Sequence, residues 1–170
     1  MAIEDEPVLG RQLEAANDGD SGPLEERIRR LVTTQPYGVL CTQGEEQAYG
    51  SLVAFAFTED LREVFFCTPV ATRKYRLLTL RDRVALVVDD RPEHPGEMMR
   101  VEAITATGRA GRIDAGPQYD RCAARLVARH PQLEAFVAAD SSALFRITVT
   151  RFFHVSRFQE VRQWVPGSPS

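Results

Sequence analysis

Apolar and polar residues alternate over much of this chain, and a helical spacing replaces the alternation in only a few segments. The first such segment opens at Ser21 and Pro23 and ends before Pro36. Its apolar residues recur at intervals of three and four: Leu24, Ile28 and Leu31. This spacing puts them on one face, and a proline at the start is typical of a first helical turn. We predict a helix that docks this face on the core.

Three short β-prone segments follow, with polar turns between them: Tyr37–Thr42, Ala48–Phe57 and Glu63–Cys67. In the middle segment bulky side chains share one face, while small residues, among them Gly50, share the other. The small face would let a flat ligand or another strand approach the backbone closely. A helix packed on that face explains the small residues equally well.

Three later regions continue the strand pattern: Arg83–Asp89, Val101–Ile113 and Phe145–Trp164. The first is apolar on both faces, which favours a central position in a sheet. Short turns between the early strands make neighbours antiparallel, and few helices are expected. We therefore predict a mainly β fold of the α+β class, a barrel of six antiparallel strands with a few peripheral helices.

Two helices and one polar loop separate the later strands. One helix runs from Thr72 through Leu80, and another follows the break at 114–117 and stops at Pro131. The loop at 89–100 contains two prolines. We interpret it as a connection between strands rather than as the border of a site.

Composition and charge narrow the possible partners. The 170 residues are 44% hydrophobic and 26% charged, as in an ordinary single domain. The formal net charge of −3 provides no positive field that would attract nucleic acid or an anionic membrane. No stretch approaches the about 18 apolar residues of a membrane span. We expect a cytoplasmic protein with a flexible acidic arm at 1–20, one domain at 21–165 and a disordered tail at 166–170.

Metal and hydrolase chemistry find little support in the sequence. The three cysteines are far apart and are expected to be small buried hydrophobes: Cys41, Cys67 and Cys122. The three histidines are scattered without a carboxylate or cysteine at ligand spacing: His94, His130 and His154. We predict no metal site, and no motif of a Ser-His-Asp or Cys-His hydrolase is present.

The clearest candidate for chemistry is the start of the helix at Thr72. Thr72 is a good N-cap, so the following N–H groups would point outward with the positive end of the helix dipole behind them. Arg73 adds a planar fork for two phosphate oxygens, and Lys74 adds a mobile charge. The residues suit a bound phosphate, although residue types alone fit a solvated, capped surface helix equally well.

In its order of elements the sequence resembles the pyridoxamine 5′-phosphate oxidase-like family of FMN-binding split β-barrels. The resemblance covers most of residues 24–164, and four stretches carry it: Cys67–Lys74, Asp82–Leu86, Gly108–Ile113 and Phe153–Phe158. The last is similar to the closing strand of the haem-utilisation branch. Cys67 stands where the family usually has an aromatic residue, and Asp82 stands where it has proline.

The resemblance implies three sets of contacts to FMN. These are phosphate ligands Thr72, Arg73 and Lys74, ring neighbours Cys67 and Thr68, and mainly backbone contacts at Ser51, Leu52 and Val53. An FMN phosphate carries a charge of about −1.5 to −2, which suits two cations at a helix start. The argument from residues and the resemblance therefore agree on the phosphate.

The resemblance also implies a function and an assembly. We expect an FMN-dependent oxidoreductase, in which the cofactor carries the chemistry, with the flavin at the interface of a homodimer. Neither the substrate nor the electron donor is specified. The alternative is a non-enzymatic module that binds flavin or haem for storage, electron transfer or sensing.

We do not expect a true pyridoxamine 5′-phosphate oxidase. Those enzymes carry an Arg-x-His pair over the substrate, and the nearest candidates here are Arg151 and His154. Residues three apart in a strand point to opposite faces, so these two would not converge on one ligand unless a bulge intervened.

Overall fold

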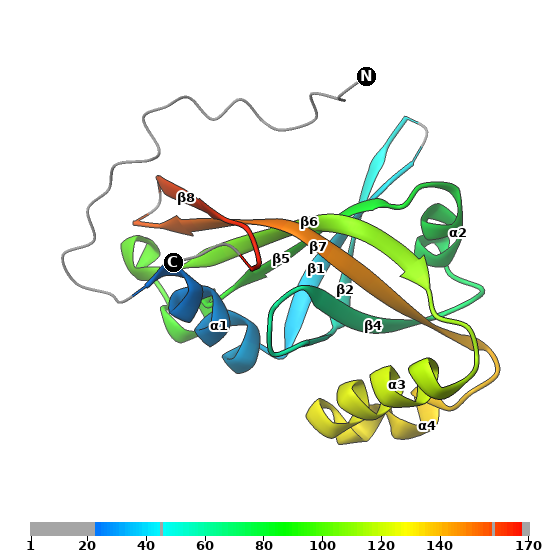
Figure 1. Cartoon of the computed structure of the whole chain (residues 1–170). Helices are drawn as coiled ribbons and strands as arrows, with labels where there is room; N and C mark the ends of the chain where they lie inside the picture. Colours follow the sequence, from blue (N-terminus) through cyan, green and yellow to red (C-terminus); the bar gives the residue numbers. More distant parts are fainter. Residues whose placement is uncertain (1–22, 45, 158, 168–170) are drawn as a thin grey trace.

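The computed structural model describes residues 23–44, 46–157 and 159–167, which form one curled antiparallel sheet with helices packed against it (Figure 1). The helices are α1 (Leu24–Thr34), α2 (Arg73–Leu80), α3 (Pro117–Arg129) and α4 (Glu134–Val137). The strands are β1 (Tyr37–Gln43), β2 (Ala48–Ala54), β3 (Ala56–Phe57), β4 (Glu63–Pro69), β5 (Arg83–Asp89), β6 (Ala103–Arg112), β7 (Ser142–Ser156) and β8 (Glu160–Trp164). The predicted arm at 1–20 and residues 168–170 of the predicted tail lie outside the described residues.

The strand order confirms the predicted class and corrects the predicted strand count. Strands pair in the order β2-β1-β5-β6-β7-β4-β3, with β8 on β7, and every pair is antiparallel. β5 lies between β1 and β6, the central position expected from its apolar run. The described residues form eight strands instead of six, because the segment 48–57 breaks at Phe55 and the last β region folds back into β7 and β8.

The break at Phe55 closes the sheet. β2 and β3 are consecutive in the chain, yet they occupy opposite ends of the strand order, so the chain passes from one edge of the sheet to the other at this residue. Phe55 is fully buried. Its carbonyl accepts a hydrogen bond from Nε2 of His130 at 2.9 Å, and the guanidinium of Arg129 lies 4.7 Å from the centre of its ring. His130 is also the C-cap residue of α3, so it both ends this helix and supports the break.

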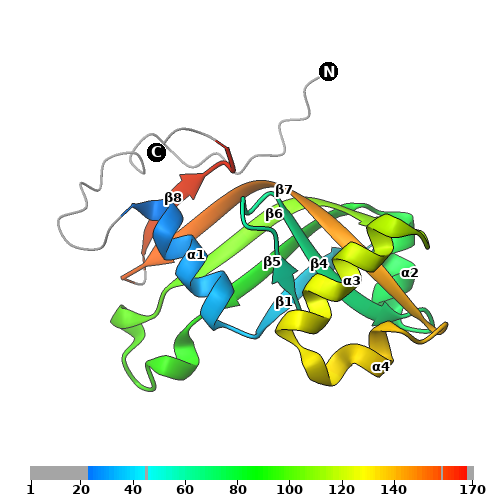
Figure 2. The ribbon, with the colours of Figure 1, turned by 60° about the horizontal axis from the view of Figure 1, so that its bottom comes forward.

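Alternating side chains divide the apolar interior between the two faces of the curled sheet. The inner face packs a cluster that includes stacked rings of Phe66 and Phe145, 5.5 Å apart, against α1. The Trp164 ring packs at the margin of this cluster, with its centre 5.7 Å from that of the Phe152 ring. A second cluster lies on the outward face of β4 and packs against α3 and α4. Figure 2 shows these two helices on that side of the sheet. No helix among the described residues is long and apolar enough to cross a membrane.

We predict that His130→Phe destabilises the protein although it keeps an aromatic ring beside Tyr37, which stacks on His130. The variant leaves the buried carbonyl of Phe55 without its donor, and such a group costs about 1–3 kcal/mol. Urea unfolding should show the free energy of unfolding lowered by this amount. A change below about 0.5 kcal/mol, the range of neutral surface substitutions, would contradict the role assigned to His130.

Candidate functional site

The first turn of α2 has the cap that the sequence predicts. The chain leaves β4 at Pro69 and enters the helix through Thr72, whose hydroxyl accepts a hydrogen bond from the Tyr75 N–H at 3.2 Å. The same hydroxyl lies 3.0 Å from that of Thr68, which is fully buried, and it donates to the carbonyl of Pro69 at 2.9 Å. These bonds fix the helix start to the end of β4, which gives the cap a rigid base.

Arg73 and Lys74 leave this turn toward different neighbours. The Arg73 guanidinium lies over the ring of Tyr49 on β2, 5.1 Å from its centre. Burial lowers the pKa of the Lys74 ammonium, and the nearby Cys67 partly offsets this. Within the described residues neither cation pairs with a carboxylate, and the N–H groups of both residues have no backbone acceptor. Two cations beside free helix N–H groups are an arrangement that suits an anion.

The predicted contacts on β2 separate into two faces. Ser51 has a buried hydroxyl with no hydrogen-bond partner, and Val53 is buried in the core beside it. Leu52 points the other way and is 68% exposed. The small face that includes Gly50 is also exposed, so it remains open to a ligand or another chain.

Cys67 lies on the outward face of β4, where it packs beside α3. Burial raises the pKa of its thiol, outweighing the opposite effects of Ser142 and Lys74, so the sulfur is neutral at pH 7. The structure thus brings Thr68 beside Thr72 and Cys67 beside Lys74.

Tyr49 is a neighbour of Arg73 that the sequence reasoning missed. The two residues are 24 positions apart in the chain, so no local spacing could link them.

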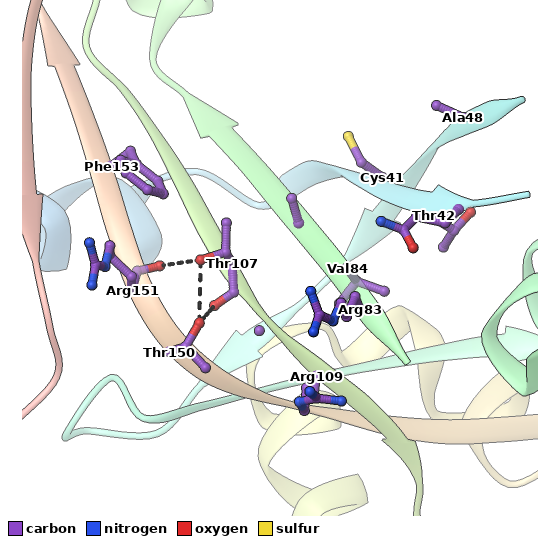
Figure 3. A pocket seen from close by; sticks show the side chains of 13 residues that line it. Cys41, Thr42, Ala48, Arg83, Val84, Thr107, Arg109, Thr150, Arg151 and Phe153 are labelled. Atoms are coloured by element: carbon purple, nitrogen blue, oxygen red, sulfur yellow. Dashed lines mark hydrogen bonds between the residues drawn. The ribbon is translucent and has the colours of Figure 1, made fainter. Parts of the chain in front are cut away.

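The sequence reasoning also missed a groove on the outward side of the sheet. It has a volume of about 590 Å³ and crosses β1, β5, β6 and β7 (Figure 3). Arg83, Arg109 and Arg151 line it together with Cys41, and Thr107 bonds to the Arg151 carbonyl at its floor. The sequence could not show this groove because its residues come from five separate strands, Ala48 of β2 included.

Two expectations about cysteine and histidine need correction. Cys41 and Cys67 are only half-buried, because both face outward from the sheet, whereas Cys122 is buried as expected. His94 does have carboxylates at ligand spacing: the ligand atoms of Asp90, Glu93 and His94 lie within 4.8 Å of one another. The 3₁₀ turn at 91–93 brings these residues together.

This acidic group already has protein partners. Asp90 is fully buried, pairs with Arg30 at 3.1 Å and accepts the Glu102 N–H at 2.7 Å. Glu93 accepts a hydrogen bond from Gln35. The cluster therefore serves to hold the loop after β5 against α1.

Arg151 and His154 lie on opposite faces of β7, as predicted. Arg151 faces the outer groove, whereas His154 is fully buried and bonds to Glu102 at 2.8 Å. The register between β6 and β7 shifts between Thr107 and Gly108, so a bulge precedes both residues and does not separate them. The spacing argument therefore holds.

The comparisons with known proteins agree with this fold. A model of the pyridoxamine 5′-phosphate oxidase family matches residues 24–156. No curated protein matches the chain in a sequence search. Among solved structures, a heme binding protein from Mycobacterium smegmatis superposes with a TM-score of 0.76 and 15% identity, covering 86% of this chain and 60% of that chain.

Two other solved structures share the fold over most of their own length. HutZ, the heme storage protein from Vibrio cholerae, has a TM-score of 0.66 and 15% identity, covering 86% of this chain and 96% of its own. An FAD-binding protein from Mesorhizobium loti has a TM-score of 0.59 and 16% identity, covering 76% and 91%. The chain thus spans under two thirds of the Mycobacterium smegmatis protein but nearly all of these two.

Proposed function

The chain belongs to the pyridoxamine 5′-phosphate oxidase family, and from this premise we propose that it is an FMN-binding flavoprotein that acts as an oxidoreductase on a small molecule. The observation that carries the proposal is the start of α2, where Arg73 and Lys74 lack carboxylate partners among the described residues beside a capped helix terminus. A phosphate monoester is the anion that this combination suits.

The described residues fit the cofactor at both of its ends. The phosphate would receive the Arg73 fork, the Lys74 ammonium and the free N–H groups of the helix. The buried Ser51 hydroxyl lacks a partner, and the polar edge of a flavin ring would supply one. Lys74 is desolvated, so a phosphate dianion beside it would stabilise its charged form. FMN, when bound, supplies hydride or electron transfer.

Tyr49 and Cys67 would shape the site without taking part in acid–base chemistry. The Tyr49 ring holds the Arg73 guanidinium in place from β2. Cys67 would lie beside the flavin as a neutral thiol, because burial raises its pKa. This fits chemistry carried by the cofactor, in which the protein binds and orients the reactants.

A haem-binding module is the second candidate, because solved neighbours of the same fold include heme-binding proteins. The histidines of this chain favour flavin instead. His130 and His154 are buried and bonded to Phe55 and Glu102, and His94 lies 3.6 Å from Asp90. A haem iron would have to displace one of these contacts to gain a histidine ligand.

We also propose that the protein forms a homodimer in the cytoplasm. The outer groove and the exposed Leu52 form a concave and partly apolar surface that a second copy would cover. Phe152 on β7 is fully buried within the chain, so it does not contribute to this surface. Three free thiols fit a reducing compartment.

We expect the purified protein to be yellow, with an absorbance spectrum that NAD(P)H or another reductant bleaches and oxygen restores. Mass spectrometry of the released ligand should give FMN. The loaded protein should not convert pyridoxamine 5′-phosphate at an enzymatic rate, because Arg151 and His154 face apart. A haem Soret band, or a flavin that no donor reduces, would support the second candidate instead.

We predict that Arg73→Ala weakens FMN much more than riboflavin, which lacks the phosphate. The loss for FMN should be roughly ten- to a hundred-fold in Kd, as for a charge-assisted hydrogen bond. Arg76→Ala, also on an exposed position of α2, is the matched control and should leave both affinities unchanged. Fluorescence titration measures all four values, and equal losses for the two ligands would refute the phosphate assignment.

We predict that the flavin-loaded protein sediments as a dimer at micromolar concentration. Leu52→Glu puts a charge on the exposed face of β2 and should shift the protein toward monomers, whereas Leu80→Glu, also exposed, is the control. A wild-type protein that sediments as a monomer with flavin still bound would contradict the homodimer.

A further inference from the structure

Unpaired positive charge collects on the exposed side of α2. Arg76 on this helix and Arg81 at its C-cap are exposed, and neither guanidinium has an ion pair or a hydrogen bond to a described residue. Arg112, at the end of β6, donates to the Tyr75 hydroxyl at 2.8 Å and has no carboxylate partner within the described part of the chain. Three guanidinium groups around α2 therefore keep their full charge.

This side of α2 differs from the rest of the described surface. Most arginines elsewhere pair with a carboxylate or a backbone carbonyl, as Arg146 does with Glu63. Asp82, which follows Arg81, pairs with Arg109 at 2.7 Å, so that pair adds no net charge to the surface. The whole chain carries a formal net charge of −3, so the exposed side of α2 opposes the overall sign.

An apolar side chain lies within this positive surface. Arg76 and Leu80 are four residues apart in α2, so they share one face of the helix. Leu80 is 64% exposed, whereas Leu77 and Leu78 are buried on the other side of α2. An apolar contact beside arginines is typical of protein–protein interfaces, in which arginine is enriched. This combination favours a protein partner over a nucleic acid.

The surface adjoins the proposed flavin site without sharing its residues. Arg73 lies one helical turn before Arg76, at the start of α2. A flavin phosphate would neutralise Arg73 and Lys74 and would leave Arg76 and Arg81 unpaired. Figure 1 shows α2 and α1 at different ends of the curled sheet, so a protein docked on α2 would lie beside the flavin and away from α1.

We propose that the exposed side of α2 is the docking surface for a small acidic electron-carrier protein that reduces the flavin, an inference that rests on the proposed function. Complexes of electron carriers are small, and charge complementarity sets their orientation. The net charge of −3 repels an acidic carrier elsewhere, so the local field directs it to α2. Each carrier is oxidised by one electron, and two carriers with two protons from water reduce one flavin.

The test uses the flavin-loaded full chain and a reduced, acidic [2Fe–2S] ferredoxin of the plant type, with a potential of about −400 mV. Stopped-flow absorbance at low salt should show fast bleaching of the flavin, which salt at about 0.15 M slows by screening. Arg76→Glu and Arg81→Glu should each lower the second-order rate constant on the order of ten-fold. Arg100→Glu, the same change of charge on an exposed residue of the loop beside α1, is the control and should leave the rate unchanged.

Dithionite separates this proposal from the flavoprotein function. If dithionite bleaches the bound flavin and ferredoxin does not, the carrier proposal is overturned and the flavoprotein stands. If no flavin binds, the proposed function fails together with the electron transfer, and calorimetric titration of oxidised ferredoxin onto the same variants still decides the docking surface. Unchanged FMN affinity confirms that each variant is folded.

Two further results would overturn the docking surface. One is a rate for Arg76→Glu and Arg81→Glu equal to that of Arg100→Glu. The other is binding of a short oligonucleotide or of anionic phosphatidylserine vesicles that depends on Arg76, while ferredoxin does not bind.

Discussion

The closure of the sheet at Phe55 is the constraint on which the remaining structure depends. A strand that leaves one sheet edge and joins the other must interrupt its ladder of hydrogen bonds, and the interrupted carbonyl here is buried. A buried carbonyl needs a donor, and His130 supplies it. Arg129, the preceding residue, covers the Phe55 ring and donates to carbonyls at the end of α1. The last residues of α3 thus tie the break, the first helix and the sheet together.

This closure also assembles the candidate flavin site. β2 and β4 are not hydrogen-bonded neighbours, yet the switch of edges brings the first against the open side of the second. Tyr49 on β2 therefore reaches Arg73, which follows β4, across 24 residues of chain. Side chains alternate along β2, so Leu52 lies on the exposed face while its two neighbours in the strand point inward. One face of β2 is therefore turned toward the candidate site, and the other face is exposed.

Charge is distributed in this molecule against its overall sign. The chain is acidic, but cations gather at the start of α2 and in the outer groove. At the start of α2 the cations lack carboxylate partners among the described residues. Local arrangement rather than net charge therefore decides where an anion can bind. The loop after β5, which the sequence suggests is a plain connection, is held to α1 by Asp90 and Glu102, which pair with Arg30 and Arg27.

The sequence by itself determined what depends on neighbours along the chain. The helix that ends before Pro36, the Thr72 cap, the central strand Arg83–Asp89 and the opposite faces of Arg151 and His154 all follow from spacing and turn chemistry, which act over a few residues. The tertiary structure alone decided the split at Phe55, the contact of Tyr49 with Arg73 and the outer groove. Each of these joins residues from separate elements, and the curl of a closed sheet, which no local pattern encodes, sets the distances between them.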